Sequence, residues 1–260
     1  MNSEPLDVIP LWFFFLLVTA IGMFALEGGY RLGRWRHTRE SEEKDAPVAA
    51  MVAAILGLLA FMLAFTFSLA AARFDARRQA VVDEANSIGT TYLRTRLLPE
   101  PHRSETARLL RQYTELRVQH PTRDRVSTLM AQSEELHERL WSQGVAAAEK
   151  VPSPITGLFL QSLNETIDLH SKRVFVGIRS RIPITIWVAL LALTVLGMAS
   201  VGYQAGLSAT RRSPEMPIMT LAFAGVLLLI VDLDRGHEGL LQVSQQAMID
   251  LHKSMQATPQ

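Results

Sequence analysis

The sequence contains no cysteine, and this absence excludes disulfide bonds, thiolate metal sites and cysteine nucleophiles. It also lacks an excess of either charge, because 26 basic and 25 acidic residues leave a formal net charge of +1. A balance of this kind gives no case for a nucleic-acid partner. Neither a glycine-rich phosphate loop nor a serine elbow is present. We therefore expect neither an enzyme nor a bound cofactor.

Charge is also missing locally, from four long stretches of the 260-residue chain: residues 8–26, 46–72, 182–210 and 216–231. Uncharged, mostly apolar stretches of about 18 or more residues are candidates for membrane-spanning helices. They exclude a freely soluble fold and predict four spans, at residues 8–28, 47–71, 183–204 and 216–232. The fourth run is short, reaching only about 24 Å. It could lie partly within protein, or gain length through Pro217 and Asp232 at its ends. The first is a span rather than a secretory signal, because residues 1–10 contain Glu4 and Asp7 and no basic residue.

The polar residues 73–182, between spans two and three, are predicted to be helical throughout. Apolar residues recur there at helical spacing, and proline breaks the pattern near Pro99, Pro121 and Pro152. Ser153 or Thr122 is a candidate N-cap for the helix that follows. No proline or glycine separates span two from residues 73–88, so one helix of roughly 50 residues and about 75 Å should run to about Leu98. A similar long helix should lead into span three, with Pro183 as its only kink.

These patterns predict an all-α protein with four transmembrane helices. A long insert, an antiparallel helix bundle, lies between spans two and three. The chain then divides into residues 1–72 (spans one and two), 73–182 (the insert), 183–235 (spans three and four) and 236–260 (a C-terminal tail).

Basic residues in the short loops indicate which side of the membrane faces the cytoplasm. The loops after spans one and three lie on one side and contain seven of them: Arg31, Arg34, Arg36, Arg39, Lys44, Arg211 and Arg212. The positive-inside rule makes that side cytoplasmic and the insert extracytoplasmic, with most weight on the first loop. Nine basic residues lie on the opposite side: Arg73, Arg77, Arg78, Lys172, Arg173, Arg179, Arg181, Arg235 and Lys253. The protein is therefore predicted to be a multi-pass protein of the cell membrane.

Span two has two notable stripes. Small residues recur every four positions at Ala60, Ala64, Ser68 and Ala72, and Ala49, Ala53 and Gly57 precede them at the same spacing. Such ridges let helices approach closely in lipid. Beside them lie Phe61, Phe65 and Leu69, which could form an apolar constriction in a pore. The pore-lining candidates are therefore Gly57, Phe61, Ala64, Phe65, Ser68 and Leu69. Ordinary packing against lipid or protein is the competing explanation.

Charged residues collect where spans two and four end on the same side of the membrane. This boundary cluster comprises Arg73, Asp75, Arg77, Arg78, Asp232, Asp234 and Arg235. The cluster could form an ion vestibule or a structural belt of salt bridges.

Histidine and glutamate supply no convincing metal site. Glu134 and His137 have the Glu-x-x-His spacing of di-iron bundles, but a second pair is missing. This segment is therefore interpreted as a solvent-facing helix surface. His170 falls on the apolar side of its helix, and there we expect a buried core histidine.

Two runs of sequence resemble the bacterial bestrophin-like family of multi-pass membrane proteins. They are LAFTFSLAAARFDARRQAVVDEANSIG, from Leu63 to Gly89, and VDLDRGHEGLLQVS, from Val231 to Ser244. The family usually continues Asp-Arg with Pro-Phe-Ser-Gly, whereas Gly236, His237 and Glu238 precede Gly239 here.

The family is distantly similar to true bestrophins, which are oligomeric anion channels whose second span lines the pore. That resemblance implies a homo-oligomer in the lipid bilayer that conducts small anions, with Phe61, Phe65 and Leu69 at its neck. It also implies a cytoplasmic insert, contrary to the loop charges. Asp232 and Asp234 are too few for the calcium clasp of animal bestrophins. The alternative function is a non-conducting membrane sensor or scaffold whose insert binds a ligand or a partner.

Orientation can be tested with single cysteines, because the native chain has none. Cysteines at Ser41 and Ser208 should be protected from membrane-impermeant thiol reagents in intact cells, and one at Ser142 should be labelled. Labelling of Ser41 and Ser208 with protection of Ser142 would place the insert in the cytoplasm instead.

Overall fold

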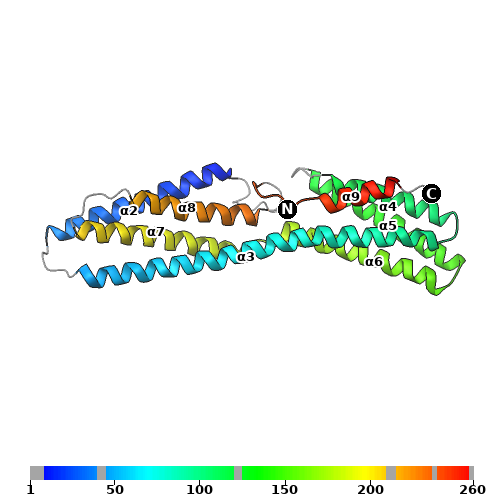
Figure 1. Ribbon diagram of the computed structural model, residues 1–260, viewed down its shortest axis with the longest axis horizontal. Coiled ribbons are helices and arrows are strands. Elements are labelled where there is room, and N and C mark those ends of the chain that lie inside the picture. Colours follow the sequence, from blue (N-terminus) through cyan, green and yellow to red (C-terminus); the bar gives the residue numbers. More distant parts are fainter. Residues whose placement is uncertain (1–8, 40–44, 120–124, 209–214, 236–238, 258–260) are drawn as a thin grey trace. The chain divides into compact units, whose positions relative to one another are not determined.

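The computed structural model describes residues 9–39, 45–119, 125–208, 215–235 and 239–257 (Figure 1). This part of the chain is helical, without strands, so the predicted all-α class is confirmed. The helices are α2 (Leu11–His37), α3 (Asp45–Arg94), η1 (Thr95–Leu97), α4 (His102–Val118), α5 (Val126–Lys150), α6 (Pro154–Val174), η3 (Phe175–Arg179), α7 (Ile184–Leu207), α8 (Glu215–Asp234) and α9 (Gln246–Ala257).

Four of these helices are long and apolar enough to cross a membrane, as the charge-free runs predict. They lie at Leu11–His37, Pro47–Leu97, Ile184–Leu207 and Glu215–Asp234. Helix α8 has 20 residues and includes Pro217 and Asp232. Its length of about 30 Å matches the thickness of a bilayer core.

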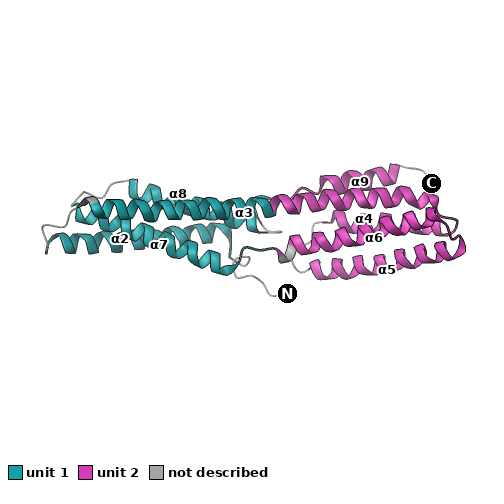
Figure 2. Ribbon diagram, turned by 90° about the horizontal axis from the view of Figure 1, so that it is seen from below, with its two compact units in different colours: residues 1–73, 181–241 teal, residues 74–180, 242–260 magenta. Residues whose placement is uncertain are grey.

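The chain forms two compact units, coloured separately in Figure 2. Unit 1 comprises residues 1–73 and 181–241, and unit 2 comprises residues 74–180 and 242–260. Helix α3 contributes its apolar part to unit 1 and its polar part to unit 2. Its 50 residues form one unbroken helix, as the lack of internal proline and glycine near residue 73 predicts.

Unit 1 is organised by very close packing of α2 against α7. A Cβ atom added at Gly29 would lie 1.9 Å from the carbonyl oxygen of Ala199, and one at Gly202 would lie 2.0 Å from that of Leu26. Gly33 and Gly206 approach the backbone of the opposite helix just as closely. Each helix thus presents glycines four residues apart, the spacing that allows helix backbones to touch in lipid.

The other helices of unit 1 surround this pair. Helix α8 packs on α2 and α7, and the side chain of Thr220 lies where a Cβ of Gly22 would point. Helix α3 packs on α7, where Ile55, Leu56 and Leu59 surround Gly197.

Unit 2 is a helical bundle with a continuous apolar core. The polar part of α3 contributes Ile88 and Tyr92, and residues from α4, α5, α6 and α9 complete the core. Helix α4 packs on α5 and α9, and α5 packs on α6. A small hydroxyl network joins α3 to α6, because Thr91 donates to the Ser162 carbonyl at 2.9 Å and lies 3.0 Å from the Thr166 hydroxyl.

The ends of the helices in unit 2 follow local sequence signals. Ser153 caps α6 in a capping box with Thr156, and Pro154 follows at the first helical position. The predicted cap is therefore confirmed, whereas Thr122 and Pro121 lie outside the described residues. Helix α9 lies in the segment expected to be a tail, and it packs on α4 with Met248 and Met255 fully buried.

The long helix expected to lead into span three is interrupted. Helix α6 is followed by the π-helical turn η3, and residues 180–183 are not helical. Pro183 disfavours helical geometry at the preceding residue, and the freed backbone N–H of Ile182 donates to the Asp234 carboxylate at 3.1 Å. The prediction that Pro183 is only a kink was therefore wrong.

Neighbouring glycines of α2 provide a matched test of the close packing. Gly29→Ala places a methyl group against the Ala199 carbonyl and should lower stability by about 1–3 kcal/mol. Gly28→Ala meets nothing within 4 Å and should be neutral or slightly stabilising, because alanine is the better helix former. Thermal unfolding of the purified protein in detergent measures both. Equal melting temperatures for the two variants would contradict the packing described.

Candidate functional site

The first candidate site is the outer face of α3, defined here by Gly57, Phe61, Ala64, Phe65 and Ser68. All five are exposed, with Phe61 at 64% and Phe65 at 57% of full residue exposure. A Cβ atom at Gly57 would meet nothing within 4 Å. Five of the six pore-lining candidates therefore lie on one open face.

The inner face of the same helix packs into unit 1. Leu59, Leu63, Thr66 and Ala70 are buried, and helical periodicity places them opposite the small-residue ridge. Leu69, the sixth candidate, is half-buried at the edge between the two faces. The ridge thus points away from the core of its own chain and is available to lipid or to another copy.

Two acidic members of the boundary cluster, Asp232 and Asp234, are buried and bind backbone N–H groups. Asp232 accepts hydrogen bonds from the backbone N–H groups of Leu240 at 2.7 Å and Leu241 at 3.1 Å. Asp234 accepts from Ile182, and Arg181 donates to the Asp234 carbonyl oxygen. These contacts fix the segment just before α7 and the segment just after α8 to the last turn of α8. They support a structural role for the two carboxylates.

The other members of the cluster differ in exposure. Arg77 and Arg235 are buried, Arg73 is half-buried, and Asp75 and Arg78 are exposed. Arg235 donates to the carbonyl oxygen of Ile9. The pairing of the aspartates with Arg73 or Arg77 stays a prediction.

A second candidate site surrounds a buried carboxylate, Glu84 of α3, in unit 2. Its side chain is fully shielded and accepts a hydrogen bond from the Tyr113 hydroxyl at 2.6 Å. Arg117 places Nε 3.0 Å from Oε1, and Arg173 donates Nη1 to Oε2. His170 Nδ1 lies 3.0 Å from the Tyr113 hydroxyl and 3.6 Å from Oε1. The Glu84 cluster therefore joins helices α3, α4 and α6.

His137 of α5 completes the Glu84 cluster. Its ring centroid lies 4.8 Å from that of Tyr113 and 4.9 Å from that of His170. Its Nε2 is shielded from solvent and has no hydrogen-bond partner among the described residues. The prediction of a solvent-facing surface was therefore wrong at His137, although it holds for the exposed Glu134. His170 is buried as predicted.

The surroundings set the protonation of these groups. Burial alone would raise the pKa of Glu84, but hydrogen bonding with His170 and the charges of the two arginines hold this pKa well below its usual value. Burial and the charge of Glu84 raise the pKa of Tyr113 well above 10.0, so its hydroxyl stays a donor. Burial and the neighbouring His170 lower the pKa of His137 to about 4. The cluster at neutral pH therefore combines one carboxylate, two arginines and a neutral His137.

Sequence reasoning missed Glu84, although a signal was present. It falls between Val81 and Ile88 on the apolar face of α3, three residues after the first and four before the second. A carboxylate on such a face needs a buried cationic partner. Among the described residues, no group of three or more histidine, aspartate or glutamate side chains is arranged to hold a metal ion.

Comparison with known proteins places the chain in a family. A family model described as a Bestrophin-like domain matches residues 13–248. The chain therefore belongs to the Bestrophin-like family, and it is a membrane protein of bestrophin architecture. No curated protein matches it in sequence.

Solved structures share this fold along nearly their whole length. A variant of a bacterial bestrophin homologue from Klebsiella pneumoniae aligns with TM-score 0.66 and 14% identity, covering 95% of this chain and 99% of that one. Another structure of the Klebsiella homologue gives TM-score 0.64 and 15% identity, covering 95% and 97%. A structure described as a membrane protein gives TM-score 0.65 and 16% identity, covering 96% and 100%. At these identities the likeness establishes the fold.

The lowered pKa of His137 predicts a specific loss of stability in acid. Between pH 6.5 and pH 4, His137 is protonated in the unfolded chain but remains neutral in the folded chain. The free energy of unfolding therefore decreases as the pH falls. The loss by pH 4.5 should be about 2–3 kcal/mol. Glu84 adds its own loss only below its ordinary pKa of 4.5.

Thermal unfolding between pH 7 and pH 4.5 measures this effect. His137→Phe keeps a ring against Tyr113 and should flatten the decline in melting temperature. His37→Phe, at an exposed histidine, should leave the decline unchanged. A decline equally steep in His137→Phe and in the native protein would refute the assignment.

Proposed function

We propose that this protein is a homo-oligomeric anion channel in which the outer face of α3 lines the path. The observation that carries the proposal is the exposure of this face within its own chain. A spanning helix that presents a ridge of glycine, alanine and serine outward can be approached closely by its copies around an axis.

The residues of α3 supply the parts that such a path needs. Phe61 and Phe65 lie about one helical turn apart and would form apolar rings that gate by dewetting. Of the charged residues that follow the apolar part, Arg78 and Asp75 are exposed, and Arg78 would raise the local concentration of anions. Arg77 is buried and Asp75 opposes Arg78, so we expect weak rather than strict anion selectivity.

For the orientation we retain the extracytoplasmic insert that the loop charges favour. Helix α2 ends with Arg34, Arg36 and His37 in its last turn, and Arg31 and Arg39 are exposed beside them. This basic end suits the cytoplasmic surface.

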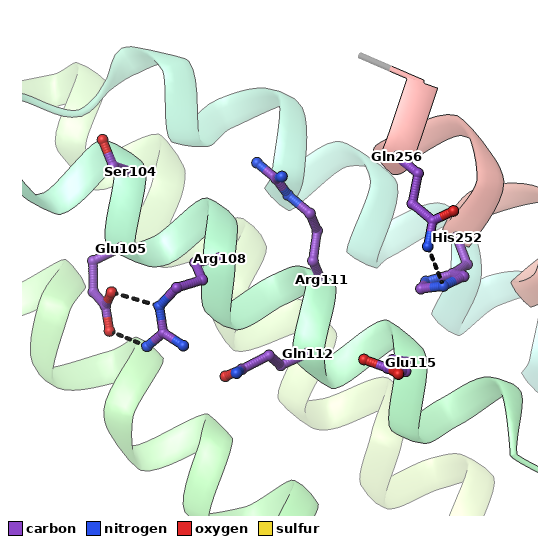
Figure 3. Close-up of a pocket in the computed structure, with 8 residues that line it drawn as sticks. All are labelled: Ser104, Glu105, Arg108, Arg111, Gln112, Glu115, His252 and Gln256. Carbon is purple, nitrogen blue, oxygen red and sulfur yellow. Dashed lines mark hydrogen bonds and ion pairs between the residues drawn. The ribbon is translucent and has the colours of Figure 1, made fainter. Parts of the chain in front are cut away.

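A second candidate function is a non-conducting sensor or scaffold. The observation that favours it is a polar pocket of about 430 Å³ in unit 2, lined by residues of α4 and α9 (Figure 3). A polar pocket in unit 2 suits ligand binding whether or not the protein conducts.

Ion flux from liposomes tests the channel proposal. Phe61→Ala/Phe65→Ala should widen the apolar constriction and raise chloride flux severalfold without changing assembly. Phe67→Ala is the matched control, because Phe67 is also exposed (40%) but lies on a different side of α3. It should conduct like the native protein.

Two results would contradict the proposal. Flux no greater than that of empty liposomes, for the native protein and the double variant alike, would favour the sensor or scaffold. Equal flux from the double variant and from Phe67→Ala would show that the outer face of α3 does not line the path.

A further inference from the structure

The face of α2 that points away from α7 ends in exposed aromatic and cationic side chains. The glycines of α2 pack on α7, and helical periodicity turns Phe24, Arg31 and Trp35 to the opposite side. Phe24 is 79% exposed, Trp35 is 52% exposed, and the side chain of Arg31 is 77% exposed. These side chains are therefore open to whatever surrounds the helix, which for a spanning helix includes lipid.

Trp35 is the common neighbour of two exposed arginines. The guanidinium carbon of Arg39 lies 4.3 Å from the centroid of the Trp35 ring, within the range of a cation–π contact. Arg31 precedes Trp35 by four residues, a spacing that makes two side chains neighbours on one helix face. Arg31, Trp35 and Arg39 together are called the outer patch.

The backbone around the outer patch is held in place. The hydroxyl of Thr38 donates to the carbonyl oxygen of Trp35 at 2.8 Å, and the backbone N–H of Arg39 donates to that of Arg36 at 2.9 Å. One turn earlier, a Cβ atom at Gly33 would lie 2.2 Å from a carbonyl oxygen of α7. Because the end of the helix is already ordered, a ligand on the outer patch has less conformational entropy to overcome.

The outer patch follows directly after the apolar part of α2. Residues 8–26 contain no charge, and Phe24 precedes Arg31 by seven residues, about 10 Å along the axis. Between them lies Gly28, where a Cβ atom would meet nothing within 4 Å. An apolar side chain, a gap and then cations follow the order of acyl chain, glycerol and phosphate in a phospholipid. Tryptophan at such a boundary is typical of membrane interfaces.

The described end of α2 has an excess of positive charge. Residues 27–39 contain four arginines and one glutamate, which gives four minus one, or +3. The single glutamate, Glu27, lies 2.8 Å from Nε of Arg31. Three acidic residues come next in the sequence, outside the described residues: Glu40, Glu42 and Glu43. The attraction for an anion therefore belongs to the outer face of α2 rather than to the loop as a whole.

We infer that the outer patch binds the headgroup of an anionic glycerophospholipid, with Arg31 and Arg39 donating to its phosphate and the acyl chains lying along Phe24. The guanidinium group presents a planar fork of donors that matches phosphate oxygens. Basic residues at a membrane surface are attracted to anionic lipids. The inference is independent of whether the protein conducts and of which side of the membrane the insert occupies.

Thermal unfolding of the purified full-length protein in micelles of a neutral detergent tests the inference. The probes are phosphatidylglycerol, phosphatidylcholine with the same acyl chains, and inorganic phosphate, all at constant ionic strength. A ligand that binds the native state raises the melting temperature. Phosphatidylglycerol should do so saturably and at a lower mole fraction than phosphatidylcholine, whose ammonium group repels the arginines. Inorganic phosphate should not do so, because it lacks the chains that contact Phe24.

Variants identify the donors. Arg31→Gln/Arg39→Gln should raise the half-saturating mole fraction of phosphatidylglycerol at least about tenfold, because both charges that attract the headgroup are removed. Arg96→Gln/Arg125→Gln removes the same charge from exposed arginines of unit 2 and should titrate as the native protein does. Glu27→Gln should lower the half-saturating mole fraction, since Arg31 loses a competing carboxylate, and misfolding cannot produce this gain.

Four results would overturn the inference. They are no rise in melting temperature with phosphatidylglycerol, half-saturation by both lipids at the same mole fraction, equal titrations of the two double variants, and an equal rise with inorganic phosphate. The second result would indicate a membrane anchor that does not distinguish headgroups, and the last would indicate a site for soluble anions.

Discussion

The backbone contact between α2 and α7 is the constraint on which unit 1 depends. Without a hydrophobic driving force between helices in lipid, close van der Waals packing has to hold them together. Glycines on both helices allow this: Gly29 faces the Ala199 carbonyl and Gly202 faces that of Leu26. The inner face of helix α3 also packs into unit 1, where Leu59 and Leu63 are buried. Its small-residue ridge therefore remains on the outside, where the proposed path would form.

Unit 2 depends on a different interaction, the buried Glu84 carboxylate. Removing one partner of a buried ion pair leaves an uncompensated charge and costs several kcal/mol, so the cluster fixes how α3, α4 and α6 pack. Arg173 extends it by donating to Gln245 at 2.7 Å, just before α9. The same cluster thus anchors the start of the helix that forms one wall of the α4–α9 pocket, and this links the order of the bundle core to the shape of that pocket.

The sequence was sufficient for features that depend on local chemistry. Charge-free runs located the spanning helices, the lack of proline near residue 73 predicted the unbroken α3, and Ser153 was found as a cap. Features that depend on distant segments were missed. The facing glycines of α2 and α7 are visible as spaced pairs, but their partnership is not. The place of Glu84 on an apolar face indicates burial, but it does not identify Tyr113, Arg117 and Arg173 as the partners. Outside the membrane, His137 was assigned to solvent because its spacing was compared with a metal motif rather than with its neighbours.

If α3 lines the proposed path, its outer face meets the same face of another copy. Oxidative cross-linking of single-cysteine proteins in native membranes tests it directly, because the chain has no other cysteine. Ser68→Cys, on the ridge, should form covalent dimers, whereas Ser200→Cys, near the end of α7, should remain monomeric. Monomers from Ser68→Cys under conditions that cross-link Ser200→Cys would contradict the account.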